Sequence, residues 1–154
     1  MDTFKAYKMR ELLFMDKETY QALAKARLER AQELVNEAEE LLERGSYKSA
    51  NNRAFYSIEK SLRAMLAIKG IDADSHNGIL RQFNVHFIRN SEAGFEQGDY
   101  KVIANAQRIR NISDYDDFYI ADKEECREQV KTAKDVVKKA QRFLETTLNS
   151  TRRE

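Results

Sequence analysis

Proline is absent from the 154 residues of this chain, and glycine occurs only five times. A proline inside a helix removes a hydrogen bond and clashes with the preceding turn, so its absence leaves long helical segments uninterrupted. Strong helix formers such as Ala, Leu, Glu, Lys and Arg are abundant instead. The composition therefore predicts an all-α protein.

Cysteine and histidine are almost as scarce. The single cysteine, Cys126, excludes an intramolecular disulfide and a zinc site built from several cysteines, and we expect its thiol to be half-buried or on a helix surface. The two histidines, His76 and His86, stand ten residues apart, too far along one helix to share an ion. Neither a Glu-x-x-His pair nor a G-x-x-x-x-G-K phosphate loop occurs. The sequence predicts no metal and no cofactor.

Neither sign of charge dominates, since 27 Lys and Arg residues face 26 Asp and Glu residues. Net charge therefore gives no support to non-specific nucleic-acid binding, which would need a local basic patch. No apolar run reaches the 18 residues of a membrane span, and Leu12–Met15 is too short for a signal-peptide core. We expect a cytoplasmic protein without a membrane partner.

Apolar residues recur every three or four positions, and this periodicity predicts five helices, over about 17–44, 47–69, 75–89, 99–113 and 123–149. Gly45 and Gly70 are predicted to close the first and second helices, and Ser46 and Ser75 to cap the second and third. Short connections favour an up-down antiparallel bundle whose first and last helices are neighbours.

One domain is predicted over residues 17–149. Residues 1–16 are interpreted as an N-terminal extension associated with a partner or a dimer, and residues 150–154 as a frayed tail. The fourth helix is expected to turn four apolar residues inward: Val102, Ile103, Ala106 and Ile109.

The segment Gln107–Tyr119 carries the densest polar chemistry in the chain. Arg108 and Arg110 lie about 200° apart on a helix, and Arg110 is the one nearer the apolar stripe. A partly buried arginine at a helix C-terminus is favoured by the helix dipole but needs a carboxylate or an anionic ligand. The nearest carboxylates are Asp114, Asp116 and Asp117. A structural ion pair and an anion- or RNA-binding site remain open as alternatives.

A second group of polar residues lies on the second predicted helix. Asn52, Tyr56 and Lys60 are spaced at i, i+4 and i+8, with Arg53 beside Tyr56. This ridge is either a solvated face or part of the same site.

Three segments, in this order, resemble the HEPN superfamily in its small stand-alone prokaryotic branch. They are residues 52–66 (NRAFYSIEKSLRAML), residues 75–83 (SHNGILRQF) and residues 114–119 (DYDDFY). The resemblance implies a helical bundle that pairs as a homodimer, with a polar site near the dimer interface. It also implies RNA cleavage or RNA binding, and in several members a nucleotidyltransferase partner in a toxin–antitoxin pair.

In nuclease members of this superfamily, an arginine is followed by four to six residues and then a histidine. Arg110 and Asn111 match the start of that motif, whereas Tyr115, Asp116 and Asp117 occupy the permitted histidine positions. Lys60 stands where this branch often carries a histidine. Since histidine shuttles protons near neutral pH and tyrosine does not, the substitution argues against efficient cleavage.

The sequence therefore predicts a non-catalytic or weakly catalytic domain that binds RNA, a nucleotide or a partner protein. The candidate ligand-binding residues are Arg110, Asn111, Asp114, Tyr115, Arg53, Tyr56, Lys60 and His76. One alternative is a metal-free endoribonuclease in which Arg110 acts with His76, Asp116 or Asp117. A further alternative is a partner-binding module in which the Arg110–aspartate pairing is purely structural.

Overall fold

A computed structural model of the chain describes residues 16–152. Within this range the elements are α2 (Lys17–Glu43), α3 (Tyr47–Ile68), α4 (His76–Phe83), the π-helical turn η1 (Asn84–Ile88), α5 (Gly98–Tyr115) and α6 (Lys123–Arg152). These residues contain no strand, so the predicted all-α class is confirmed. The predicted N-terminal extension lies outside the described residues, apart from Asp16, which caps α2.

Capping residues and glycines that are visible in the sequence mark several of the helix ends. Asp16 accepts a hydrogen bond from the Thr19 amide (2.8 Å), and Ser75 accepts one from the Gly78 amide (3.0 Å). Ser46 holds the predicted cap position of α3, but its side chain forms no capping bond. Gly45 and Gly70 end α2 and α3 with φ of 79° and 72°, the left-handed conformation that glycine adopts without strain.

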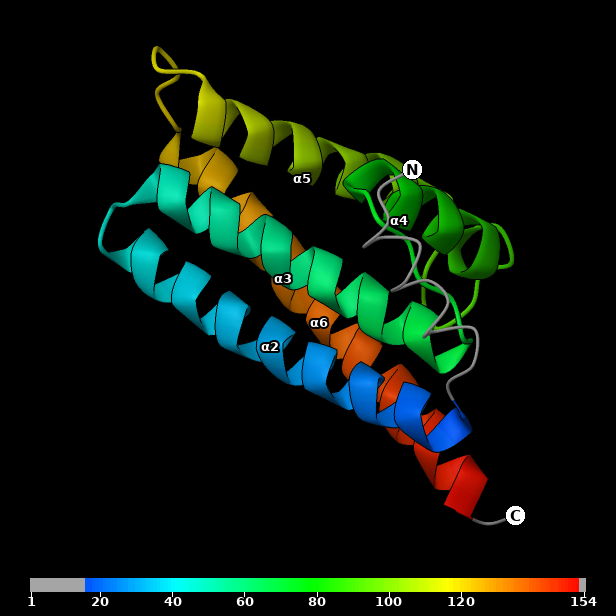
Figure 1. Ribbon diagram of the computed structural model, residues 1–154. Coiled ribbons are helices and arrows are strands. Elements are labelled where there is room, and N and C mark those ends of the chain that lie inside the picture. The colour runs from blue at the N-terminus through cyan, green and yellow to red at the C-terminus, as the bar shows by residue number, and fades with distance from the viewer. Residues whose placement is uncertain (1–15, 153–154) are drawn as a thin grey trace, which may run out of the picture.

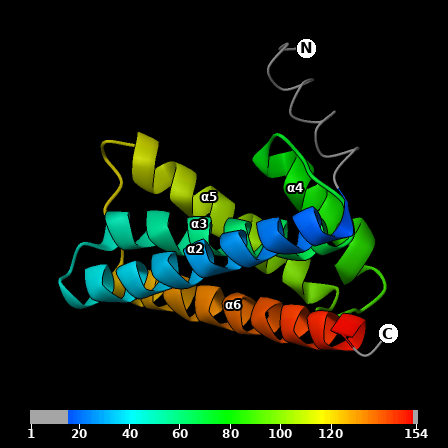
Figure 2. The same ribbon diagram turned by 60° about the horizontal axis from the view of Figure 1, so that its bottom comes forward.

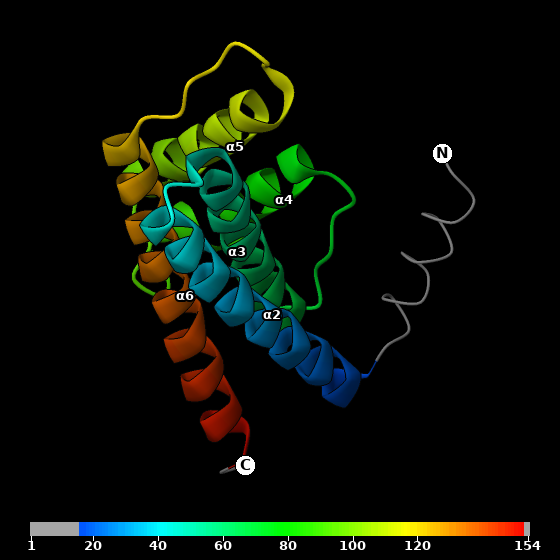
Figure 3. The same ribbon diagram turned by 90° about the vertical axis from the view of Figure 1, so that its left-hand side faces the viewer.

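Helix α3 is the centre of the bundle and packs against α2, α6, α5 and α4. Figure 1 shows α2 and α3 as an antiparallel pair, with α6 running along both and antiparallel to α2. The first and last described helices are therefore neighbours, as predicted. Figures 2 and 3 show α4 and α5 lying against α3. The first turn of α5 also reaches α6, where Lys139 Nζ lies 3.8 Å from Asp99 Oδ2.

The core combines small residues with a cluster of aromatic rings. Ala24, Ala31 and Ala38 recur along α2 without any exposure, which allows close approach of α3. Phe83 stacks on Phe87 with ring centroids 4.8 Å apart, and Phe95 meets Phe83 edge-on at 4.8 Å. Phe95 therefore anchors the connection between η1 and α5 to the core.

Two predictions about this fold were wrong. Val102 is 45% exposed, because α5 buries only the stripe through Ile103, Ala106, Ile109 and Arg110. Cys126 is fully buried, and its Sγ lies 3.6 Å from the Tyr47 carbonyl oxygen. Helix α6 extends to Arg152, three residues beyond the predicted end at about 149.

Candidate functional site

Arg110 lies near the C-terminal end of α5, on the face that packs against α3. Only 10% of its side chain is exposed, whereas Arg108 points to solvent. The guanidinium carbon lies 5.1 Å from the Tyr56 ring centroid, 5.5 Å from that of Tyr115 and 5.9 Å from that of Phe55. The predicted burial of Arg110 is confirmed, and three aromatic rings stabilise its charge.

Every nitrogen of the Arg110 side chain faces a polar neighbour. Nη2 donates to the Tyr56 hydroxyl (2.5 Å), and Nη1 donates to Asn111 Oδ1 (3.0 Å). Nε lies 3.0 Å from Asp114 Oδ2, an ion-pair distance, yet its N–H does not point at that oxygen and makes no hydrogen bond. A buried donor left without an acceptor costs about 1–3 kcal/mol. The Arg110–Asp114 contact is thus an ion pair with imperfect hydrogen-bond geometry.

Asp114 also joins α5 to α3. Its Oδ2 accepts a hydrogen bond from Asn52 Nδ2 (2.9 Å), while Asn52 Oδ1 accepts one from Arg53 Nη1 (2.6 Å). Arg53 Nε in turn donates to Glu37 Oε2 of α2 (3.0 Å). We refer to Asn52, Arg53, Tyr56, Arg110, Asn111, Asp114 and Tyr115 as the Arg110 site. These contacts link side chains of three helices.

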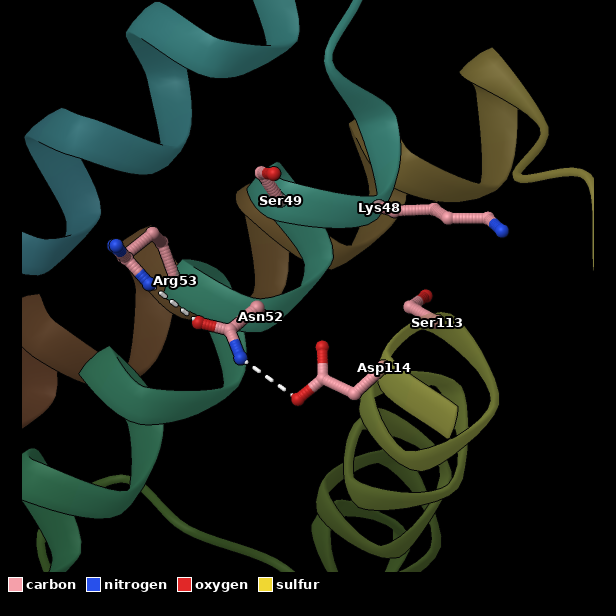
Figure 4. A pocket seen from close by; sticks show the side chains of 6 residues that line it. All are labelled: Lys48, Ser49, Asn52, Arg53, Ser113 and Asp114. Atoms are coloured by element: carbon pink, nitrogen blue, oxygen red, sulfur yellow. Dashed lines mark hydrogen bonds between the residues drawn. The ribbon is translucent and has the colours of Figure 1, made fainter. Parts of the chain in front are cut away.

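An open depression of about 400 Å³ lies beside this network, lined by Lys48, Ser49, Asn52, Arg53, Ser113 and Asp114. Figure 4 shows Asn52 and Asp114 pointing toward each other from α3 and α5. Lys48 and Ser49 stand in the first turn of α3, where free backbone N–H groups and the helix dipole favour anions. Sequence reasoning missed Lys48, Ser49 and Ser113, because nothing in their local pattern sets them apart from ordinary surface residues.

Beneath the depression, Asn51 connects α3 to α5 in the interior. Asn51 Nδ2 donates to Ser113 Oγ (3.1 Å), while its Oδ1 is buried without a hydrogen-bond partner. Asn51 is only 2% exposed. The sequence offered one signal, an asparagine directly beside the Asn52–Tyr56 ridge, but the pattern did not show that it points inward.

His76 reaches the Arg110 site through Tyr56. It begins α4, and its ring meets Phe55 edge-on at 5.3 Å and Tyr56 at 6.2 Å between centroids. Its Nδ1 is hydrogen-bonded to the carboxylate of Glu59, a buried residue that sequence reasoning did not single out. The predicted grouping of Tyr56, His76 and Arg110 is thus present, with Tyr56 between the other two.

The remaining predicted residues lie elsewhere. Asp116 and Asp117 follow the end of α5, are exposed, and form no ion pair with Arg110 within the described residues. Asp116 Oδ1 instead accepts a hydrogen bond from the Phe118 amide (2.9 Å). Further along this connection Tyr119 is bonded to Glu125, and burial together with that bond raises the pKa of Tyr119 to about 12. Among the three aspartates of this segment, Asp114 is the one that pairs with Arg110, because it lies one helical turn away.

Lys60 does not join the Arg110 site either. It lies one turn beyond Tyr56, and its pKa is lowered by burial first and then by the charges of Arg63 and Arg27. Metal binding and membrane spanning find no support in residues 16–152. In that range, no group of three or more His, Cys, Asp or Glu side chains is placed to hold a metal ion, and no helix has the length and apolarity of a membrane span.

The HEPN domain model matches residues 24–146, which is most of this chain. The chain belongs to the HEPN domain family. The match contains α3, α4 and α5, and therefore every residue of the Arg110 site and His76. Tyr115, the last residue of α5, is 73% exposed in this HEPN domain.

Named relatives agree with this assignment. The chain is 29% identical to a UPF0332 protein of Thermotoga maritima over 116 residues, which is 75% of this chain and 81% of that protein. It is 32% identical to a Methanocaldococcus jannaschii protein named "Putative toxin" over 108 residues, or 70% and 76% of the two chains. A UPF0332 protein of Pyrococcus horikoshii is 37% identical over 59 residues, which cover 38% of this chain and only 42% of that relative.

Proposed function

We propose that this HEPN domain binds single-stranded RNA at the Arg110 site, and that binding rather than efficient cleavage is its function. The observation that carries the proposal is that Asp114 joins an open depression lined by cations to the arginine that lies among aromatic rings. Lys48 and Arg53 line the depression with Asp114, and Asp114 Oδ2 lies 3.0 Å from Arg110 Nε. The exposed Tyr115 ring lies 5.5 Å from the Arg110 guanidinium.

These groups match the two parts of an RNA strand. The first turn of α3, with Lys48, provides positive charge and backbone N–H donors for a phosphate. Tyr115 offers a largely exposed ring, and stacking of a base on such a ring contributes about 1–3 kcal/mol. Single-stranded RNA, whose bases are unpaired and accessible, can use both contacts at once.

The residues after Arg110 favour binding over cleavage. Metal-free cleavage of RNA needs a group that exchanges a proton near neutral pH. Tyr115, Asp116 and Asp117 are the residues at the positions of the motif histidine, and none of them is an imidazole. Asp114, which lines the depression, repels a phosphate unless Arg110 and Lys48 offset its charge.

Fluorescence anisotropy with a labelled single-stranded RNA octamer tests the proposal. Replacing Tyr115 with Ala should weaken binding by roughly fivefold to a hundredfold, the loss of one stacked base. Tyr100→Ala is the matched control, because Tyr100 is a 40% exposed tyrosine on the same helix outside the Arg110 site. Equal affinities for the two variants would place the site elsewhere, and a wild-type protein that binds no RNA would refute the function.

A second candidate function, a weak endoribonuclease, is favoured by one observation. Glu59 holds His76 by Nδ1, as carboxylates do when they orient a catalytic imidazole, and His76 lies against Tyr56 beside Arg110. This candidate predicts RNA cleavage that is lost in His76→Gln while RNA affinity persists. Intact RNA after prolonged incubation with the wild-type protein would rule it out.

We further propose that the domain is a homodimer and one component of a cytoplasmic toxin–antitoxin pair whose other component is a nucleotidyltransferase. The names of the two Methanocaldococcus jannaschii relatives support this role. Expression of the chain alone should slow growth, and co-expression of a nucleotidyltransferase from the neighbouring gene should relieve the effect. Sedimentation velocity should give twice the mass of one chain. Unimpaired growth and a monomeric mass would contradict these two points.

A further inference from the structure

A second group of cations lies where α2 meets the C-terminal half of α3. Arg27 of α2 donates from Nη1 to the backbone carbonyl of Arg63 (3.4 Å), and Arg63 donates from Nη2 to the carbonyl of Ala73 (3.4 Å). Lys60 lies one helical turn before Arg63 on the same face of α3. We refer to Arg27, Lys60 and Arg63 as the cation cluster.

Two carboxylates partly balance this cluster. Asp72 Oδ2 is 3.5 Å from Arg27 Nη2, and Glu59 Oε1 is 3.6 Å from Arg63 Nε. Glu59 also binds His76 with its other oxygen, so its charge is shared. Within residues 16–152 the Lys60 ammonium has no hydrogen bond and no ion pair, which leaves three cations against two carboxylates.

The polar groups of the cluster are also incompletely bonded. Arg63 Nε is buried without a hydrogen-bond acceptor, although its side chain is only 3.6 Å from Glu59. The side chains of Arg63 and Arg27 are 21% and 11% exposed, so water screens their repulsion poorly. The lowered pKa of Lys60 has burial as its main cause and the neighbouring arginines next. An added anion with several acceptor oxygens would relieve this repulsion.

The cluster lies on the helix that carries half of the Arg110 site. Asn52, Tyr56 and Lys60 follow one another at four-residue intervals, so Lys60 is about 12 Å along α3 from Asn52, at 1.5 Å per residue. That distance corresponds to about three to four stacked nucleotides of one strand, at 3.4 Å each. A strand held at the Arg110 site is therefore long enough to reach the cluster.

We propose that Arg27, Lys60 and Arg63 form a phosphate-binding site, and that it takes a backbone phosphate of the RNA strand bound at the Arg110 site. The phosphate site itself stands on the cluster geometry. Its use by RNA rests on the proposed function. The ligand chemistry is a phosphate monoester or diester, whose tetrahedral oxygens accept from the Lys60 ammonium and the two guanidinium groups.

Calorimetry with inorganic pyrophosphate tests the phosphate site without RNA. The variant is Lys60→Gln, and the matched control is Lys138→Gln, an exposed lysine of α6. Loss of one charge-assisted contact should weaken pyrophosphate binding about tenfold in Lys60→Gln and leave it unchanged in the control. Absence of pyrophosphate binding by the wild-type protein, or equal binding by both variants, would overturn the proposal.

Thermal unfolding of the same variants shows whether Lys60 has a structural role. Without ligand, Lys60→Gln should melt about 1–2 °C higher than the wild type, because it removes a repelled charge. A lower melting temperature would mean that Lys60 has a stabilising partner in the folded chain, which contradicts its role as an unpaired ligand-binding cation.

RNA binding separates this inference from the proposed function. Lys60→Gln should weaken binding of the RNA octamer about tenfold and reduce the slope of log affinity against log salt by about 0.7, the value for one phosphate on a single strand. Binding of an RNA dinucleotide, too short to reach the cluster, should not change. Octamer binding independent of Lys60 refutes the shared strand, whereas a chain that binds pyrophosphate through Lys60 but no RNA refutes the proposed function alone.

Discussion

The hydrophobic core and the α3–α5 contact differ in how completely their buried polar groups are hydrogen-bonded. In the core, the Ser57 and Ser61 hydroxyls donate to carbonyls of their own helix, those of Ala54 (2.8 Å) and Ser57 (2.9 Å). In the α3–α5 contact, Asn51 Oδ1 and Arg110 Nε are buried without hydrogen-bond partners. Unsatisfied groups of this kind lower stability and are typical of functional sites. The core is built for stability, and the α3–α5 contact keeps donors and charges that stability alone would not retain.

The largest effect on the free energy of unfolding should come from a substitution in the hydrophobic core. Leu66 is 1% exposed and belongs to the central hydrophobic cluster. Leu66→Ala should lower the free energy of unfolding by about 2–5 kcal/mol, measured by urea denaturation, whereas the volume-conserving Leu66→Met should cost less than about 1.5 kcal/mol. If Leu66→Ala lowers the free energy of unfolding by less than about 1 kcal/mol, the core is loosely packed. The core and the α3–α5 contact would then differ less than proposed.

A smaller effect is expected on the polar side. Arg110→Met keeps most of the side-chain volume and removes the ion pair with Asp114 and the bond to Tyr56. It should lower the free energy of unfolding by about 1–3 kcal/mol and abolish most RNA affinity.

Adding Asp114→Asn to Arg110→Met should recover part of that stability, because it removes the carboxylate left without its cation. RNA affinity should stay low, since the binding cation is still missing. If Arg110→Met lowers the melting temperature but leaves RNA binding intact, the Arg110–Asp114 pair is structural, and the domain fits a partner-binding module better.

The smallest expected effect is a dependence of the free energy of unfolding on pH, caused by a buried thiol of the core. Burial raises the pKa of Cys126 from 9.0 to about 11. The folded state therefore holds the thiol proton more tightly than the unfolded state does. This contribution is fully present below pH 9 and is lost as pH rises from about 9 to 11.

Unfolding free energies measured from pH 7 to 11 should fall more steeply for the wild type than for Cys126→Ala. Both proteins retain Tyr119, whose raised pKa adds the same alkaline slope to each. Parallel curves would show that the Cys126 thiol is not held in an environment that penalises its ionisation.

Much of the fold follows from residue periodicity, because each long helix packs one continuous apolar stripe. The apolar pattern within one helix did not predict burial where packing against another helix determines it. Val102 has the right residue type for the core but lies beyond the edge of the face that α3 covers. The π-helical turn at Asn84–Ile88 has no signature in a three-and-four repeat, and the burial of Cys126 depends on where Tyr47 of α3 lies.

The candidate site was predictable in part for the same reason. Arg110 and Asp114 are one turn apart, so their pairing could be read from one helix. The bonds of Asn52 to Asp114 and of His76 to Glu59 join different helices and needed the tertiary structure. Lys60 was assigned to the Arg110 site because it continues the Asn52–Tyr56 ridge. Burial and Arg63 affect its pKa most, followed by Arg27 of α2, which no α3 pattern reveals.

The bond between Arg110 and Tyr56 has a directional consequence. The Tyr56 oxygen accepts from Arg110 Nη2, so its own hydrogen points away from that guanidinium and can only be donated. Lys48 and Arg53 at the same depression are also donors. Among Tyr56, Lys48, Arg53 and Asp114, only the Asp114 carboxylate has no hydrogen to donate, so the other three favour ligand groups that offer lone pairs over groups that offer hydrogens.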